Sequence, residues 1–166
     1  MVTAERTWKQ GLAIGLIAYA SIAIFYAVFD LLAARGTFFT VDMMGKAVFH
    51  GQRDPAVLLY PIPLDLAGIF WYNALHLVLS LAIGLTVVGL VDAGERHPAR
   101  ARFILLFLVA GYVVTVLAVG SLSTAMRPVL PWWSIAAANG FAAFTAGLYL
   151  LRRRPGLFRR PALAPE

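Results

Sequence analysis

Two polar side chains interrupt an otherwise apolar stretch, WYNALHLVLSLAIG, at residues 71–84. Asn73 and His76 are three residues apart, and on a helix of about 3.6 residues per turn this spacing puts them on one face. Ser80 and Gly84 continue that face, whereas leucine, valine and isoleucine fill the others. Because an ionisable group is costly inside a membrane, a histidine in such a stretch raises a functional hypothesis.

Two further polar residues lie within apolar stretches and could approach this histidine. Asn139 is in WWSIAAANGFAAF, and Asp30 is near the end of the first apolar stretch of the chain. With a rise of about 1.5 Å per residue, we expect His76 about 13–15 Å below the nearer membrane boundary, Asn73 and Asn139 roughly 10 Å below it, and Asp30 about 6 Å below it. We therefore predict an intramembrane polar cluster of Asp30, Asn73, His76 and Asn139 as the candidate cofactor-binding site.

Three kinds of chemistry are open to His76. In a structural role, its neutral ring is buried between the helices and hydrogen-bonded to an asparagine of another helix, an interaction worth about 0.6 kcal/mol on average. In a redox role, it holds haem b or a quinone. In a transport role, His76 or Asp30 carries a proton across the membrane. The structural role is the one that we expect.

The redox role makes different demands for its two cofactors. Haem b needs an axial ligand, commonly His or Met. The chain has no second deep histidine, so His50 could serve only if its segment dips inward, and Met126 is at the membrane edge. A quinone needs one hydrogen-bonding His or Asn together with aromatic walls, which Tyr26, Trp71 and Tyr72 could supply.

Familiar catalytic motifs are missing from the sequence. There is no HExxH, no GxSxG and no Walker loop. The lack of cysteine excludes iron–sulfur clusters, thiolate zinc sites and covalently attached haem c. We therefore expect a protein that is not an enzyme and binds no cofactor, with His76 or His50 as the ligand if a metal is held.

The composition indicates a membrane protein. Of the 166 residues, 61% are hydrophobic and 13% are charged, whereas a soluble domain averages about 25% charged residues. The mean hydropathy is +0.79. The net charge of +6 could suggest nucleic-acid binding, but the basic residues flank the apolar stretches, where they act as topology signals.

Four stretches are long and apolar enough to cross a hydrocarbon core of about 30 Å. These predicted spans are residues 11–34, 66–91, 101–124 and 132–151. The fold class that follows is an all-α polytopic membrane protein, a four-helix transmembrane bundle that forms a single domain over residues 1–166.

The connection at residues 35–65 is the only sizeable one, and we expect it to form an external lid over the bundle. In it, TVDMMGKAVFH predicts a short amphipathic helix capped by Thr40, with Val41, Met44 and Val48 on the apolar face and an Asp42–Lys46 pair on the polar face. The dipeptide at residues 54–55, Asp-Pro, predicts a second helix start, and an aspartate at position 65 caps the second span.

The basic residues also predict how the chain threads the membrane. Ten of them lie in the N-terminal segment, the second connection and the tail at residues 152–166, and four lie in the first and third connections. Because basic residues are retained on the cytoplasmic side, both termini should be cytoplasmic. We expect a multi-pass protein of the bacterial inner membrane, with the tail as a topology anchor.

Small and polar residues predict the faces on which the helices meet, because small side chains let helices approach closely in lipid. We expect each helix to have one inward face. Besides the face of Asn73 and His76, the predicted faces comprise three sets: Gly11, Gly15, Tyr19, Ala23, Tyr26 and Asp30; Gly111, Thr115 and Ala118; and Ala136, Gly140, Ala143 and Gly147.

These patterns leave three function classes. The first, which we favour, is a non-catalytic subunit or an assembly or accessory factor of a membrane complex, surrounded by lipid and docked to other membrane subunits or to copies of itself. The second is a redox subunit that binds haem or quinone through His76. The third is a small dimeric transporter, in which Asp30 or His76 is the proton site.

Overall fold

The computed structural model describes residues 4–54, 61–97 and 101–154, and every regular element in these ranges is a helix. The elements are α1 (Ala4–Leu32), α2 (Phe39–Phe49), α3 (Leu66–Arg96), α4 (Ala101–Leu122), the short 3-10 helix η2 (Thr124–Met126) and α5 (Trp132–Arg153). Four of these helices are long and apolar enough to cross a membrane, which confirms the prediction of a multi-pass membrane protein.

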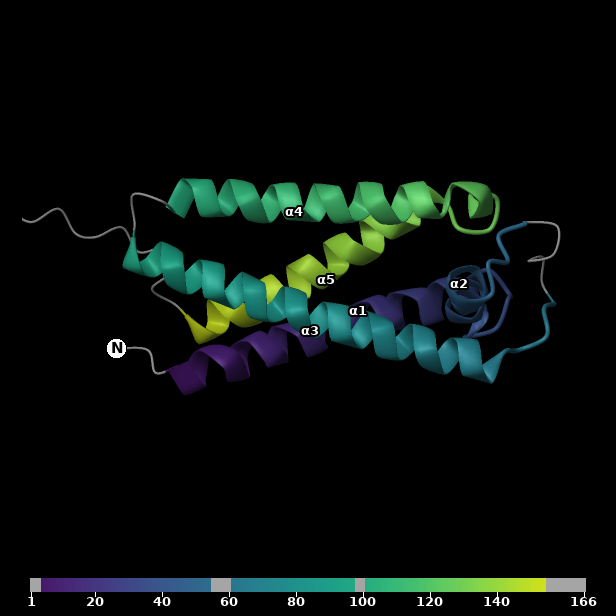
Figure 1. The fold of residues 1–166 in the computed structure, drawn as a ribbon, viewed down its shortest axis with the longest axis horizontal. Coiled ribbons are helices and arrows are strands. Elements are labelled where there is room, and N and C mark those ends of the chain that lie inside the picture. The colour runs from purple at the N-terminus through teal and green to yellow at the C-terminus, as the bar shows by residue number, and fades with distance from the viewer. Residues whose placement is uncertain (1–3, 55–60, 98–100, 155–166) are drawn as a thin grey trace, which may run out of the picture.

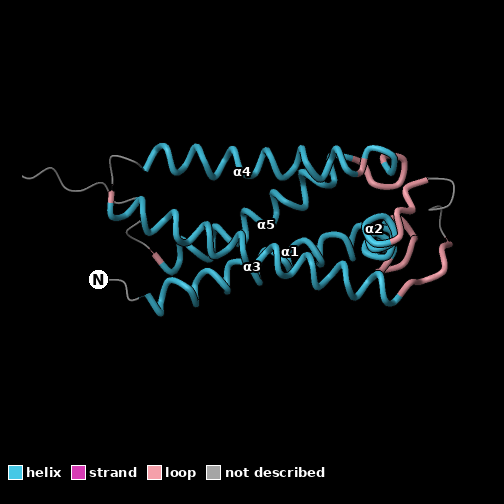
Figure 2. Tube along the Cα trace, in the orientation of Figure 1, coloured by secondary structure: helices cyan, strands magenta, loops and turns pink. Residues whose placement is uncertain are grey.

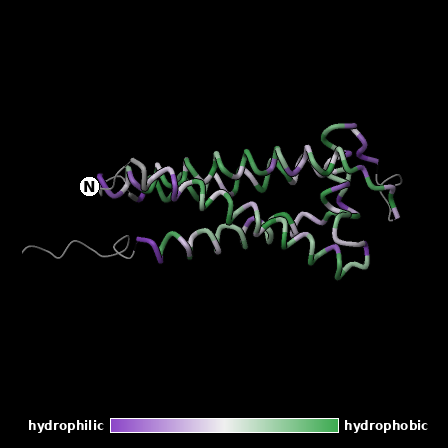
Figure 3. Tube along the Cα trace, turned by 90° about the horizontal axis from the view of Figure 1, so that it is seen from below, coloured by the Kyte–Doolittle hydropathy of each residue, from purple (hydrophilic) through white to green (hydrophobic). Residues whose placement is uncertain are grey.

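The four long helices run side by side along the molecule, and α2 lies across one end (Figure 1). That end, here the α2 end, also holds η2 and the first residues of α3 and α5; α1 begins and α5 finishes at the opposite, N-terminal end (Figure 2). Hydrophilic residues gather at the two ends, whereas the lengths between them are mainly hydrophobic (Figure 3). This distribution suits helices that pass through a bilayer.

Helices α1 and α3 make a close crossing at glycines. A Cβ atom at Gly84 would lie 2.4 Å from both the carbonyl oxygen of Gly11 and the amide nitrogen of Gly15. A Cβ atom at Gly15 would lie 2.6 Å from the carbonyl oxygen of Ser80. The two backbones touch here, so the inward faces predicted around Gly11, Gly15, Ser80 and Gly84 are confirmed.

Helix α5 follows its predicted face only in part: Ala136 and Gly140 meet Tyr112 of α4, but the fully buried side of the helix is a different one. Its buried residues in the span include Ala138, Ala142 and Ala146, whereas Ala143 of the predicted set is exposed. A Cβ atom at Gly147 would meet nothing within 4 Å. The prediction was wrong for Ala143 and Gly147, because alanine and glycine occur on several sides of this helix and residue size alone does not select the face.

Helix α4 packs more loosely against the other spans than they pack against one another. None of the residues in its apolar window is buried, and its mean hydropathy there is 2.6. Gly111 and Ala118 are exposed, and Thr115 donates a hydrogen bond to the carbonyl of its own helix at Gly111, so the predicted inward face is wrong. In lipid, a uniformly apolar helix gains little by burying one face rather than another.

The α2 end contains a hydrophobic core. Phe39, Met43 and Ala47 of α2 pack with apolar residues near the end of α4 and the start of α5: Met126, Val129, Leu130 and Ile135. The apolar face predicted for α2 was wrong, since Val48 is exposed and Asp42 is buried. The predicted cap at Thr40 was wrong, because the helix begins at Phe39 and Thr40 lies inside its first turn; Phe38, in the N-cap position, makes no side-chain capping hydrogen bond, and the Thr40 hydroxyl donates to Asp30.

Asp65 caps α3 as predicted, because its carboxylate Oδ1 accepts a hydrogen bond from the amide of Gly68 at 3.0 Å. The helix start predicted at residues 54–55 would continue into residues 55–60, which lie outside the described residues. The tail from residue 155 onward also lies outside them.

Candidate functional site

The predicted site centres on His76 of α3, whose half-buried imidazole contacts two tyrosine rings. The ring centroid of Tyr19, on α1, is 5.2 Å from that of His76, and the centroid of Tyr72, one helical turn earlier on α3, is 6.1 Å away. The close glycine crossing of α1 and α3 allows this contact, because it brings the two helices near enough for rings to meet.

Asn73, rather than His76, makes the polar link between these helices. The hydroxyl of Tyr19 donates a hydrogen bond to Asn73 Oδ1 at 2.9 Å, and Asn73 Nδ2 donates to the carbonyl of Ile69 at 2.8 Å. Within the described part of the chain, His76 has no hydrogen-bond partner. The hydrogen bond expected from His76 to an asparagine of another helix is therefore not formed: Asn139 bonds within its own helix, and the neighbour of His76 on α1 is the ring of Tyr19.

Asp30 is held at the α2 end. Its buried carboxylate accepts hydrogen bonds from the amide and the hydroxyl of Thr40, at 2.6 and 2.7 Å, and Arg35 Nη2 lies 3.9 Å from Asp30 Oδ1. This arrangement joins the end of α1 to the start of α2. Asp30 is therefore oriented toward α2 rather than toward His76.

Asn139 is engaged within its own helix, where its Nδ2 donates to the carbonyl of Ile135 at 2.8 Å. The structure thus groups Asn73 with His76 and places Asp30 and Asn139 elsewhere. Cofactor binding by any of the four stays a prediction.

Charged residues that the site prediction did not include fasten α2 to α3. Asp42 Oδ2 is 2.5 Å from Lys46 Nζ, as expected for an i,i+4 pair, and Asp42 Oδ1 accepts from the amide of Asp65 at 2.9 Å. Lys46 also donates to the carbonyl of Pro63. The backbones meet at Gly45, where a Cβ atom would lie 2.6 Å from the carbonyl of Gly68.

His50, the alternative metal ligand, lies in this same group. Its Nε2 is 2.8 Å from Asp65 Oδ2. The hydrogen bond from the amide of Gly68, followed by the contact with His50, lowers the pKa of the Asp65 carboxyl. Within the described ranges, no three His, Asp or Glu side chains gather closely enough to hold a metal ion.

A second polar cluster, at the N-terminal end, surrounds Arg154. The guanidinium donates to Gln10 Oε1 from Nε at 3.0 Å and from Nη2 at 2.6 Å. Its Nη1 pairs with Asp92 and with Glu95 Oε2, the latter at 3.0 Å, while Thr7 donates to Asp92 Oδ2 at 2.7 Å. This Arg154 cluster joins α1, α3 and the residue that ends α5.

Sequence reasoning assigned Arg154 to the basic tail as a topology anchor, but the side chain is 6% exposed. A signal was available: the acid at position 92 and the amide at position 10 lie at the same predicted membrane boundary as this arginine. Opposite charges at one boundary of adjacent spans favour such a pair, because an unpaired charge there would be costly.

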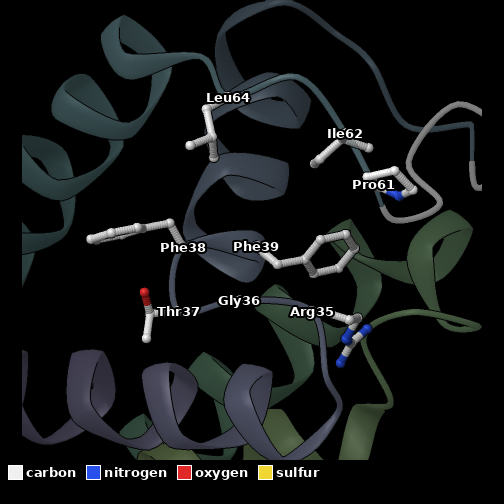
Figure 4. Close-up of a pocket in the computed structure, with 8 residues that line it drawn as sticks. All are labelled: Arg35, Gly36, Thr37, Phe38, Phe39, Pro61, Ile62 and Leu64. Carbon is white, nitrogen blue, oxygen red and sulfur yellow. The ribbon is translucent and has the colours of Figure 1, made fainter.

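Arg35 lies beside the pocket of the α2 end. Its guanidinium carbon is 4.7 Å from the ring centroid of Phe39, and Nη1 donates to the carbonyl of Val129 at 2.8 Å. The pocket has a volume of about 330 Å³; residues 35–39 form one side of it, and Pro61, Ile62 and Leu64 form the other (Figure 4). Arg35 Nε is the one buried side-chain nitrogen or oxygen among the described residues that has no hydrogen-bond partner.

Comparison with protein-family models, with curated proteins and with solved structures finds no match for this chain. In the geometry itself, the buried charges at both ends serve to hold helices together. His76 differs from them. Its ring is able to donate and accept hydrogen bonds, but it lies within a membrane span and its contacts are with aromatic rings.

Proposed function

We propose that this chain is a non-catalytic subunit or assembly factor of a membrane complex, and that α4 meets the partner subunit. The observation that supports the proposal most strongly is the exposure of α4. Its apolar window has no buried residue, and its polar link to α5 is the hydrogen bond from the Tyr112 hydroxyl to the carbonyl of Ala136, at 2.9 Å.

One exposed face of α4 suits another helix. Phe107, Gly111, Val114 and Ala118 are all exposed and follow one another at intervals of four, three and four residues. This spacing is that of the core positions in left-handed helix pairs, where a large side chain of one helix enters a gap in the other. Gly111 provides such a gap, since a Cβ atom there would meet nothing within 4 Å.

The buried charges support a structural role for the rest of the molecule. Asp30, Asp42 and Asp92 accept hydrogen bonds or pair with cations of the same chain. A buried charge whose bonding capacity is taken up by neighbouring protein groups holds helices in position. The chain therefore acts as a pre-assembled helical scaffold that presents α4 to its partner.

The proposal includes a membrane orientation. The four long helices form a bundle in a bacterial inner membrane, and α2 lies on the outer side as part of a lid. The support is the distribution of the basic residues, ten against four. A reporter fused after residue 166 should act as cytoplasmic, and one inserted near Gly51 should act as external; the opposite result would reverse the orientation.

The docking proposal can be tested by site-directed cross-linking, because the chain has no cysteine of its own. Val114 of α4 and Val78 of α3 are 63% and 62% exposed, so they form a matched pair. Each is replaced by cysteine, labelled with a benzophenone maleimide in native membranes and irradiated, and the adducts are identified by mass spectrometry.

We expect the Val114→Cys protein to form one defined adduct with a different membrane protein, and the Val78→Cys protein to form lipid adducts. Lipid adducts at both positions would contradict the proposed docking face. If the Val114→Cys protein forms an adduct with a second copy of this chain, α4 is a self-association face and the proposed docking to a different subunit is wrong.

A further inference from the structure

We propose that Tyr72 and His76 of α3, together with Tyr19 of α1, form a binding site for a lipid-soluble quinone, a ring that bears carbonyl groups. This inference goes beyond the proposed docking role and rests on different residues. The three side chains come from two neighbouring membrane spans, α1 and α3.

The first argument is that two neighbouring polar groups have no partner in the protein. Neither the imidazole of His76 nor the hydroxyl of Tyr72 makes a hydrogen bond within the described residues, whereas Tyr19 and Asn73 bond to each other. Unpaired polar groups are unfavourable in hydrocarbon, where water does not replace the missing partner. A bound molecule with acceptor atoms would satisfy both groups.

The second argument is that both groups can be reached. Arg35 Nε is the only side-chain nitrogen or oxygen of the described residues that is both unpaired and fully buried, so the His76 nitrogens and the Tyr72 hydroxyl each keep some exposed area. Tyr72 is the more enclosed of the two, with Tyr26 nearby, and His76 is the more open. Leu75 and Leu79, the neighbours of His76 on α3, are 41% and 53% exposed. A ligand dissolved in the bilayer could therefore approach from the side.

The third argument concerns the chemistry of the ligand. A neutral imidazole carries one N–H donor and a tyrosine hydroxyl carries one O–H donor, so the pair can bind carbonyl oxygens. The rings of Tyr19 and Tyr72, at 5.2 and 6.1 Å from the imidazole centroid, provide aromatic surfaces for a flat ring. A quinone ring has both features.

Depth favours a quinone over the ester carbonyl of a phospholipid. Leu66 and Phe70, at the start of α3, are exposed and apolar, so hydrocarbon begins near the start of the helix. His76 is ten residues further along, which is about 15 Å at a helix rise of 1.5 Å per residue. Ester carbonyls lie at the hydrocarbon boundary, whereas a quinone with an isoprenoid or alkyl tail enters the hydrocarbon.

The test uses the full-length protein in lipid nanodiscs and decylubiquinone labelled with ¹³C at its carbonyls. The protein is labelled with ¹⁵N at histidine, of which the chain has three residues, and His76→Gln assigns the relevant signal. We expect saturable shifts of both the His76 nitrogen and a quinone carbonyl. Tyr72→Phe and His76→Phe keep the aromatic rings and remove the donors, and each should weaken binding about tenfold, the effect of about one hydrogen bond.

Two controls make the test decisive. Val78→Phe adds a ring on an exposed side of the same helix, and it should bind decylubiquinone as the unmodified protein does. Decylbenzene, which has the tail and a ring without carbonyls, should leave the His76 signal in place. Equal binding by His76→Phe, Tyr72→Phe and Val78→Phe, or shifts that never saturate, would overturn the proposal.

The ester carbonyl of a phospholipid is the other possible partner of His76 and Tyr72. Measurements in ester-linked and in ether-linked lipids distinguish it from a quinone carbonyl, because ether lipids have no ester carbonyl. If the His76 signal differs between the two lipids and decylubiquinone does not change it, a phospholipid carbonyl is the partner and the quinone proposal fails. Because these readouts do not involve α4, failure here leaves the cross-linking test of the docking role unaffected.

Discussion

Arg154 donates two hydrogen bonds to Gln10 Oε1, from Nε at 3.0 Å and from Nη2 at 2.6 Å, across 144 positions of sequence. The same guanidinium reaches Asp92, so a single side chain joins three long helices at the N-terminal end. We expect Arg154→Met to destabilise the protein by about 3–5 kcal/mol, because it leaves the buried Asp92 carboxylate without its cation.

The measurement for this change is the free energy of unfolding in mixed detergent, with Arg152→Met as the control at an exposed neighbouring arginine. Adding Asp92→Leu to Arg154→Met should restore part of the lost stability, because the unpaired charge is then removed. Equal stability of the Arg154 and Arg152 variants would contradict the role of the Arg154 cluster.

The glycine crossing predicts a sharp difference between two glycines of α3. A Cβ atom at Gly84 would overlap the backbone of α1 at 2.4 Å, whereas one at Gly89 would meet nothing within 4 Å. Gly84→Ala should therefore lower the free energy of unfolding by about 1–3 kcal/mol or more, and Gly89→Ala should be neutral or stabilising. If the two variants unfold alike, α1 and α3 do not cross at this point.

The packing of α5 predicts that leucine substitutions at two adjacent alanines lower the stability by different amounts. Ala142 is 5% exposed against its neighbours, whereas Ala143 is exposed. Ala142→Leu should cost about 1–3 kcal/mol through overpacking, and Ala143→Leu should have little effect. The same unfolding measurement compares them, and a larger loss for Ala143→Leu would favour the face predicted from residue size.

The Asp65 carboxylate predicts a dependence of stability on pH. Its pKa is lowered in the folded state, first by the hydrogen bond from the Gly68 amide. The ionised group therefore stabilises the fold above its usual pKa, near about 4, and this contribution is lost as the pH falls through the lower folded value. Asp65→Asn should thus be less stable than the unmodified protein at pH 7, and the difference should shrink on acidification.

The docking proposal predicts that Gly111→Leu separates stability from assembly. The new side chain would extend into open space beside α4, so the free energy of unfolding should change little. It would also fill the gap offered to a partner helix, and the cross-linked adduct at position 114 should disappear. An adduct of unchanged yield would place the partner elsewhere.

Local patterns were sufficient to predict the spans, the cap at Asp65 and the contact face of α1 and α3. A membrane span needs an apolar stretch of sufficient length, and an N-cap needs the right residue beside a helix start, so both are properties of a short segment. On α1 and α3, small and polar residues lie along one face, and that coincidence marked the crossing at Gly15 and Gly84.

Only the tertiary structure decided which face of α5 is buried, that α4 stays exposed, and that Arg154 leaves the tail to join a buried cluster. It also separated Asp30 from His76, because Thr40 of α2 takes up the Asp30 carboxylate. In lipid, both the partner helix and the solvent are apolar, so hydrophobicity does not distinguish them. Which face of a helix is buried therefore depends on hydrogen bonds and close contacts, such as that between Gln10 and Arg154. These residues are far apart in the sequence, so no pattern within a short segment reveals the contact.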